Sequence, residues 1–266
     1  MRWIPVLFLA VACDARMAED TEDWWGAVGD LDEDVTEPIE FTEEPYDFSG
    51  EGIDALQAAV RTDGRVYSPE ASPAGTCDNW STSNDLPIET WAMVTLHPRY
   101  YYKTQGCDRG SDEKYYGNYF IEDQSGGMFV LNDSKVAHYE MGDRVRIRVN
   151  ALAEAFDLPR VMSHEILEVE RGPFPIHFTM AGSTTGSGDN IAYDDPSTVG
   201  RVVRAEGEVL SAPDTFGVFE ILDDNGDRHL INLDSELNRR KVRPPVGSRI
   251  QVTGPVLDAF GQKIVV

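Results

Sequence analysis

The sequence predicts an all-β protein, with two small five-stranded domains in tandem after a disordered N-terminal tether. One pattern of strands and turns occurs twice, over residues 119–156 and again over residues 219–260. Each copy holds an apolar strand, an acidic turn with glycine, a second strand, a strand headed by glycine and an Ala-Phe hairpin. In the clearest strand, residues 143–149, Val and Ile alternate strictly with Arg. This is the two-residue period of a strand with one buried face.

Residues 1–12 have the features of a bacterial export signal. Arg2 gives a positive start, and residues 3–12 form an uncharged apolar run that is too short to cross a bilayer as a helix. The run ends in LAVAC, which resembles a bacterial lipobox, where the cysteine is lipidated and becomes the mature N-terminus. We therefore expect a lipoprotein anchored through Cys13 to the bacterial cell envelope, on the periplasmic face of either membrane or on the cell surface. The alternative is a plain secretory signal cleaved near Ala12.

The other two cysteines, Cys77 and Cys107, form an even pair in a chain that is expected to be exported. Such a pair predicts a disulfide bond. The bond would close a loop of about 30 residues, which the chain-entropy account values at roughly 3–4 kcal/mol. No histidine lies near either cysteine in the sequence, so we expect no Cys/His metal site.

Residues 13–50 are expected to form an acidic, disordered tether. They carry 14 acids and one base, and such a segment buries too little apolar surface to offset the entropy of ordering. Two interpretations of its aromatic residues stay open. Those from Phe41 to Phe48 dock onto the first domain together with Ile39, or the pair Trp24 and Trp25 forms an acidic-aromatic recognition motif.

The first domain is expected at residues 51–181. Apolar residues at helical spacing predict a short helix over residues 52–61, and a loop rich in Ser, Pro and Gly follows over residues 68–87. Strand patterns then follow in order at 90–96, 99–104, 114–121, 128–131 and 143–149, with a hairpin at 151–161 and a closing strand at 166–169.

The second domain is expected at residues 190–266. A short strand at 174–180 and a Gly/Ser-rich linker at 182–189 precede it. Asn225-Gly226 is the strongest hairpin signal in the chain, because a tight type I′ turn needs a positive φ at both central residues. Strands are expected around this turn and after it, at 201–210, 230–233, 249–252 and 264–266, with a hairpin at 259–260.

The five short strands of each copy, with a glycine heading the fourth, resemble the OB-fold. The phrase YFIEDQSGGMFVL followed by MGDRVRI is similar to OB-like domains of secreted and lipid-anchored bacterial proteins. The second copy departs from this pattern at Ser248, where the first copy has Asp143. The resemblance implies two five-stranded OB-like barrels in tandem. Its motifs are structural, so it says more about the fold than about the function.

The charge of the chain argues against nucleic acid as the main partner. The formal net charge is −24, whereas binding to a phosphate backbone depends on clustered Lys and Arg. More than half of the excess negative charge lies in residues 13–50. The two predicted domains are therefore only mildly acidic.

Tyrosines gather in the predicted strands between residues 100 and 120, and they are the first candidates for ligand contact. OB-folds bind oligomers on the face of strands two and three, where aromatic rings stack on bases or sugars. We take Tyr100, Tyr102 and Tyr116 as candidate ligand-binding residues. The competing interpretation is that the aromatic residues of this stretch, Tyr119 and Phe120 among them, pack in the barrel core and the hairpin.

A basic cluster at Arg239, Arg240, Lys241 and Arg243 is the second candidate, either for an anion or for the acidic tether itself. The alternative is a solvated loop whose charges are balanced by nearby acids. The acidic turn at 223–227 lacks the spacing of a calcium loop, and its residues are explained by a hairpin. We expect no metal and no cofactor, and no catalytic constellation is recognisable.

These observations predict a non-enzymatic, lipid-anchored envelope protein that uses two OB-like domains as binding or scaffold modules. Its expected partners are the membrane, through the N-terminal lipid, and an envelope glycan or protein. The alternative is a secreted hydrolase or its accessory protein, because OB-like domains often accompany such enzymes. Two carboxylates that converge in one cleft would favour the hydrolase.

Overall fold

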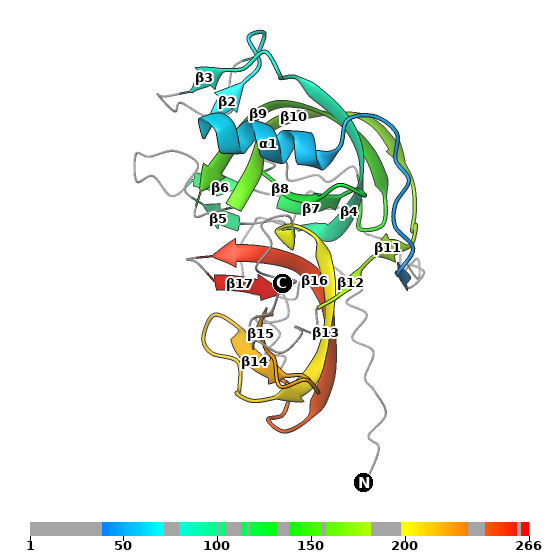
Figure 1. The fold of residues 1–266 in the computed structure, drawn as a ribbon, viewed down its shortest axis with the longest axis vertical. Coiled ribbons are helices and arrows are strands. Elements are labelled where there is room, and N and C mark those ends of the chain that lie inside the picture. The colour runs from blue at the N-terminus through cyan, green and yellow to red at the C-terminus, as the bar shows by residue number, and fades with distance from the viewer. Residues whose placement is uncertain are drawn as a thin grey trace, which may run out of the picture.

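The computed structural model shows a mostly β chain (Figure 1). The structure describes residues 39–71, 80–99, 102–104, 113–115, 118–131, 139–155, 158–181, 198–233, 243–259 and 262–265. Within these ranges there is one α-helix, α1 (Ile53–Asp63), and the all-β prediction is confirmed. No helix in these ranges is long and apolar enough to cross a membrane.

The first lobe contains α1 and a seven-stranded sheet in the order β10-β8-β7-β4-β9-β2-β3. Strand β10 is parallel to β8 and also pairs antiparallel with β9. Each of the five strands β4, β7, β8, β10 and β9 therefore pairs with two others of this set. The strands are β2 (Val66–Tyr67), β3 (Ser81–Thr82), β4 (Ile88–Arg99), β7 (Asn118–Glu122), β8 (Gly127–Val130), β9 (Arg144–Ala155) and β10 (Leu158–Glu170).

The second lobe repeats this order in a six-stranded sheet, β12-β13-β14-β15-β17-β16. Here β17 is parallel to β15, and β16 pairs with both β17 and β13. The two copies seen in the sequence therefore have the same strand connectivity. The strands are β12 (Thr179–Met180), β13 (Val202–Val209), β14 (Val218–Leu222), β15 (Arg228–Asn232), β16 (Arg249–Ala259) and β17 (Gln262–Val265).

Three predicted elements differ from the structure. The strand expected at 143–149 and the hairpin at 151–161 belong to two long strands, β9 and β10, which pair over nearly their whole length. Register shifts in β10 around Ser163 and after Ile166 interrupt the alternation of buried and exposed side chains. The alternation pattern therefore predicts several short strands in place of one long strand. The strand expected at 99–104 is divided between the end of β4 and β5 (Tyr102–Thr104), which pairs with β6 (Glu113–Tyr115) in a separate two-stranded sheet.

The core of the first lobe lies between α1 and the sheet. Ile53, Leu56 and Val60 lie on one face of the helix, are fully buried, and belong to the same apolar cluster as Val145 and Ile147. The helix was expected at residues 52–61, which is close to its observed bounds. Its N-terminus is fixed from outside by a carboxylate, since the Ile53 amide donates to Asp123 Oδ2 at 2.8 Å.

The N-terminal arm, residues 39–48, lies along the connector between the lobes, residues 171–178. Strand β1 (Phe41–Thr42) of the arm is parallel to β11 (Ile176–His177) of the connector. Phe41, Tyr46 and Phe48 pack with Ile39 against an apolar cluster that contains Met93 of the first lobe and Val202 of the second. These residues therefore dock, as one of the two interpretations of the sequence expected. Trp24 and Trp25 lie outside the described residues.

The two lobes meet backbone to backbone at Gly127 and Gly200. A Cβ atom added to Gly127 would overlap the carbonyl group of Gly200, and one added to Gly200 would overlap Gly127. Gly200 also has a φ of +86°, which side chains rarely tolerate. An apolar cluster that joins Phe120 and Phe129 of the first lobe to Val199 and Leu257 of the second extends this contact.

Gly127→Ala is therefore expected to destabilise the protein by about 1–3 kcal/mol, the usual cost of overpacking. The matched control is Gly126→Ala, whose new Cβ would meet two side chains, Gln57 Nε2 at 3.3 Å and Ile53 Cγ2 at 3.4 Å, and would overlap no backbone atom. Urea unfolding of both variants measures the difference. Equal losses in the two variants would show that the glycine contact does not constrain the junction.

Candidate functional site

Of the site residues predicted from the sequence, the structure describes two, Arg243, which is exposed, and the backbone of Tyr102. Tyr102 lies in β5, where its cross-strand partner is Tyr115. The others lie outside the described residues, namely Cys13, Cys77, Tyr100, Cys107, Tyr116, Arg239, Arg240 and Lys241. Their roles stay predictions.

Two other aromatic residues of the same stretch are placed clearly. Tyr119 is fully buried in the core of the first lobe, where its ring lies 4.6 Å from that of Tyr139. Phe120 points to the other face of β7 and packs against Phe129, with ring centroids 5.0 Å apart. Tyr119 therefore packs in the core, as the packing interpretation expected, whereas Phe120 packs at the contact between the two lobes.

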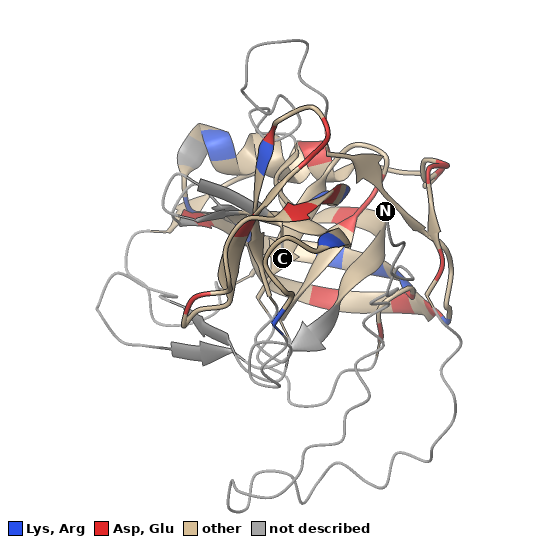
Figure 2. Cartoon of the chain, turned by 90° about the horizontal axis from the view of Figure 1, so that it is seen from below, with Lys and Arg blue, Asp and Glu red and all other residues tan. Residues whose placement is uncertain are grey.

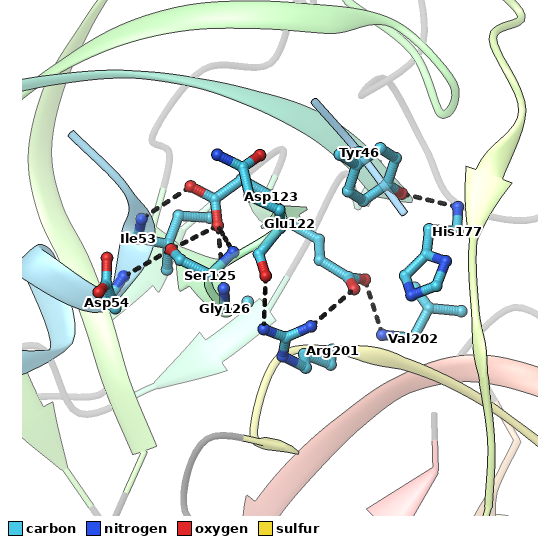
Figure 3. Close-up of polar contacts among 12 residues, drawn as sticks. Tyr46, Ile53, Asp54, Glu122, Asp123, Ser125, Gly126, His177, Arg201 and Val202 are labelled. Atoms are coloured by element: carbon cyan, nitrogen blue, oxygen red, sulfur yellow. Dashed lines mark hydrogen bonds and ion pairs between the residues drawn. The ribbon is translucent and has the colours of Figure 1, made fainter. Parts of the chain in front are cut away.

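The turn between β7 and β8, residues 122–127, brings together more polar contacts than its sequence suggested (Figure 3). Alternation along β7 places Tyr119 and Ile121 in the core and Phe120 on the opposite face. Glu122 shares the face of Phe120, which is turned toward the second lobe. A carboxyl group is thereby carried into the junction between the lobes.

Glu122 is fully buried at this junction. Its Oε2 accepts a hydrogen bond from the Val202 amide at 2.8 Å, and its Oε1 lies 3.9 Å from Arg201 Nη1. Burial raises the pKa of the Glu122 carboxyl to about 8, although the Val202 amide and Arg201 lower it in part. At neutral pH this group is therefore largely protonated, which reduces the cost of keeping it out of water.

Asp123 has a different role, although it is adjacent and equally buried. Its Oδ1 accepts from the Ser125 amide, the Ser125 hydroxyl and the Gly126 amide at 2.7–2.9 Å, and its Oδ2 caps α1. Ser125 Oγ in turn accepts from the Asp54 amide at 3.0 Å. The carboxylate closes the turn and holds the helix against it.

Gln124 completes the turn by contacting the N-terminal arm and the second lobe. Its side chain donates to the Phe48 carbonyl at 2.8 Å and accepts from the Phe48 amide at 3.1 Å. Its own carbonyl accepts from Arg201 Nη2 at 3.1 Å. Three consecutive residues thus bind the second lobe, the helix and the arm, and we call residues 122–127 the junction turn.

A second polar contact lies inside the first lobe, where Nε2 of the half-buried His164 is 3.1 Å from the hydroxyl of the fully buried Tyr119. Burial lowers the pKa of His164 to about 4 and raises that of Tyr119. The imidazole is therefore neutral at physiological pH. It forms a hydrogen bond with Tyr119 in the core, so its role is structural.

The acidic turn of the second lobe holds its own carboxylate. Asp223 Oδ1 accepts from the amides of Asn225 and Asp227 at 2.9 and 2.8 Å, and its Oδ2 lies 3.3 Å from His229 Nε2. A hairpin is present as predicted, but its turn runs from Asp223 to Gly226, since the Gly226 amide donates to the Asp223 carbonyl at 3.2 Å, so Asn225 and Gly226 are not its two central residues. In the described part of the chain, no three or more His, Cys, Asp and Glu side chains gather in a way that would hold a metal ion.

The arrangement at the junction favours mechanical coupling of the lobes over catalysis by these residues. Glu122 and Asp123 are two neighbouring carboxyl groups, but both are buried and both are occupied by protein donors. A substrate therefore has no access to either of them in this structure. No protein-family model and no curated protein matches the sequence of this chain.

The raised pKa of Glu122 predicts that stability falls as pH rises above neutrality. A carboxyl group with a folded pKa of about 8 and an unfolded pKa of 4.5 stabilises the fold fully below pH 4.5, and this contribution is lost as pH rises through 8. His164, with its lowered pKa, acts in the opposite sense only up to pH 6.5. Between pH 6.5 and 8 the loss is expected to reach about 2 kcal/mol.

Glu122→Gln should abolish this slope, because an amide does not titrate. Glu220→Gln, at a half-exposed position paired with Arg228, should keep it. Unfolding midpoints measured from pH 6 to 9 separate the two variants. A slope that persists in Glu122→Gln would assign the titration to another group.

Proposed function

We propose that this chain is a lipid-anchored protein of the bacterial cell envelope that binds a glycan or protein partner without catalysing a reaction. Two OB-like barrels would form its body. Cys13 would carry the lipid, and a disulfide bond between Cys77 and Cys107 would brace the first barrel.

The strand order supports the OB-like barrels. In an OB-fold, strand one pairs with two and four, and strand three pairs in parallel with five. In the first lobe β4 pairs with β7 and β9, and β8 is parallel to β10. In the second lobe β13 pairs with β14 and β16, and β15 is parallel to β17. The helix α1 has no counterpart in the second lobe among the described residues.

The face that OB-folds commonly use for ligands is covered in the first lobe. The outer side chains of β7 and β8 include Phe120 and Phe129, which pack in the cluster shared with the second lobe. A ligand of the first lobe would therefore have to contact the loops at the barrel rim. The loop between strands one and two is one of the loops with which OB-folds bind oligomers.

The observation that carries the proposed binding function is the hairpin in this loop. Strands β5 and β6 form their own two-stranded sheet between β4 and β7, and its register places Tyr102 opposite Tyr115. Of the candidate residues, Tyr116 directly follows β6 in sequence, and Tyr100 lies two residues before the start of β5. A tyrosine-rich hairpin at the barrel rim is suited to stacking on sugar rings or to packing against a protein.

The distribution of charge also supports a partner other than nucleic acid. Figure 2 shows Lys and Arg interspersed with Asp and Glu along the described strands. Many of these bases are paired with acids, such as Arg146 with Glu89 at 2.7 Å and Arg249 with Asp224 at 2.7 Å. Paired bases contribute little to the binding of a phosphate backbone.

Replacing Tyr102, Tyr115 and Tyr116 together with Ala is expected to abolish retention on an array of bacterial envelope glycans, or capture of a crosslinked envelope protein. The control is Phe216→Ala, which removes an exposed aromatic ring from the second lobe. It should leave retention at the wild-type level. Unchanged retention of the tyrosine variant, with its fold intact by circular dichroism, would remove the hairpin from the binding site.

The anchor is tested separately by expression of the full chain in a Gram-negative host supplied with labelled palmitate. The wild-type chain is expected to incorporate label and to fractionate with membranes, because its lipobox-like cysteine would be acylated. Cys13→Ala should do neither, whereas Cys77→Ala should do both. A labelled Cys13→Ala chain would contradict acylation at Cys13.

A further inference from the structure

The N-terminal arm touches both lobes and the connector. Backbone hydrogen bonds run from the Ile176 amide to the Glu40 carbonyl and from the Phe178 amide to the Thr42 carbonyl, both at 2.9 Å. The Tyr46 hydroxyl accepts from the His177 amide at 2.9 Å (Figure 3). The arm is therefore added to the connector as a short parallel strand.

Two arginines, one from each lobe, fix the aromatic side chains of the arm. Arg144 of the first lobe lies 3.9 Å from the ring centroid of Phe174 and 5.8 Å from that of Phe48. Arg204 of the second lobe lies 3.7 Å from the ring centroid of Phe178 and 5.6 Å from that of Phe41. In both places an arginine contacts one ring of the connector and one ring of the arm.

The outward side chains of the arm are acidic, and one of them, Glu43, interacts with Arg204. Glu43, Glu44 and Asp47 are exposed. The arm therefore presents rings to the protein at Phe41, Tyr46 and Phe48, with acids between them. This is the side-chain pattern of an extended peptide bound by β-pairing, with pockets for alternate residues and acids facing bases.

We propose that the surface formed by Arg144, Phe174, Ile176, Phe178 and Arg204 is a docking site for an extended, acidic, aromatic peptide segment. The arm of the same chain fills the site here, and the same segment supplied by a second copy or as a free peptide competes for it. This proposal does not rest on the lipid anchor or on the tyrosine hairpin. It depends only on the contacts of the arm.

We expect occupation of the site also to affect Glu122, because Phe48 of the arm is hydrogen-bonded to Gln124 in the junction turn. Tyr46 of the arm lies near Glu122, since the carboxyl charge contributes to the raised pKa of the Tyr46 hydroxyl. The other charged groups around Glu122 are Asp123 of the junction turn and Arg201 of the second lobe. Release of the arm lets water reach Glu122, so its pKa falls toward the ordinary value and the stability slope between pH 6.5 and 8 shrinks.

The test uses a fluorescent peptide of residues 37–50 and the full chain. The wild-type chain should bind the peptide weakly, because its own arm competes at an effective concentration in the millimolar range. Phe41→Ala/Phe48→Ala frees the site, and peptide anisotropy is expected to show at least a tenfold tighter apparent Kd than with the wild-type chain. Phe216→Ala changes an exposed residue of the second lobe outside the proposed site and should behave like the wild-type chain.

Binding to the double variant should also restore the wild-type pH slope. A double variant that is folded by circular dichroism and binds the peptide no better than the wild-type chain overturns the proposal. So does equal binding of a peptide with the same composition in scrambled order.

Should the double variant not fold, a protease site placed at Gly50-Glu51 in the full chain supplies the second measurement. After cleavage, the arm is expected to stay with the body in gel filtration and to exchange with labelled peptide. Loss of the arm from a folded body, with no uptake of peptide, overturns the docking site.

Discussion

The junction turn, residues 122–127, is the constraint on which the rest of the structure depends. Its consecutive side chains are committed to three different elements: Glu122 to the second lobe, Asp123 to α1, and Gln124 to the N-terminal arm. Gly127, at the end of the turn, lets the backbones of the two lobes touch. The turn therefore reverses the chain and also positions the second lobe, α1 and the N-terminal arm.

The two acids of the turn show how buried carboxyl groups are tolerated in different ways. Asp123 is surrounded by four donors from the turn and the helix, which replace its water. Glu122 has a single close donor, the Val202 amide, so burial favours its protonated form. The first arrangement holds the turn and the helix together, while the second makes the lobe junction sensitive to pH between 6.5 and 8.

Much of the fold follows from local sequence patterns. The alternation around Val145 and Ile147, the helical spacing of Ile53, Leu56 and Val60, and the Asn225-Gly226 turn each specify an element through a short-range rule. The tandem repeat then predicts that the second lobe follows the first. Strand ends around Ser163 were misplaced because bulges break the alternation that the prediction depends on.

The candidate site was less accessible to sequence analysis, because its contacts join residues far apart in the chain. Glu122 meets Val202, 80 residues away, and His177 meets Tyr46, 131 residues away. No periodicity encodes such pairs. One signal was available: Glu122 follows Tyr119, Phe120 and Ile121 in a strand too apolar to be solvated, so a carboxyl group in its register would be drawn out of water.

The amide of Val202 reports most directly on the central claim that the junction turn binds the second lobe to the first. This N–H donates to Glu122 rather than to a neighbouring strand. Amide hydrogen exchange followed by NMR at pH 6.5 should show Val202 protected to the same degree as the Ile147 amide in the core of the first lobe. In Glu122→Ala that protection should fall at Val202 and persist at Ile147. Exchange at Val202 near the rate of an unstructured peptide in the wild-type protein would contradict a fixed junction.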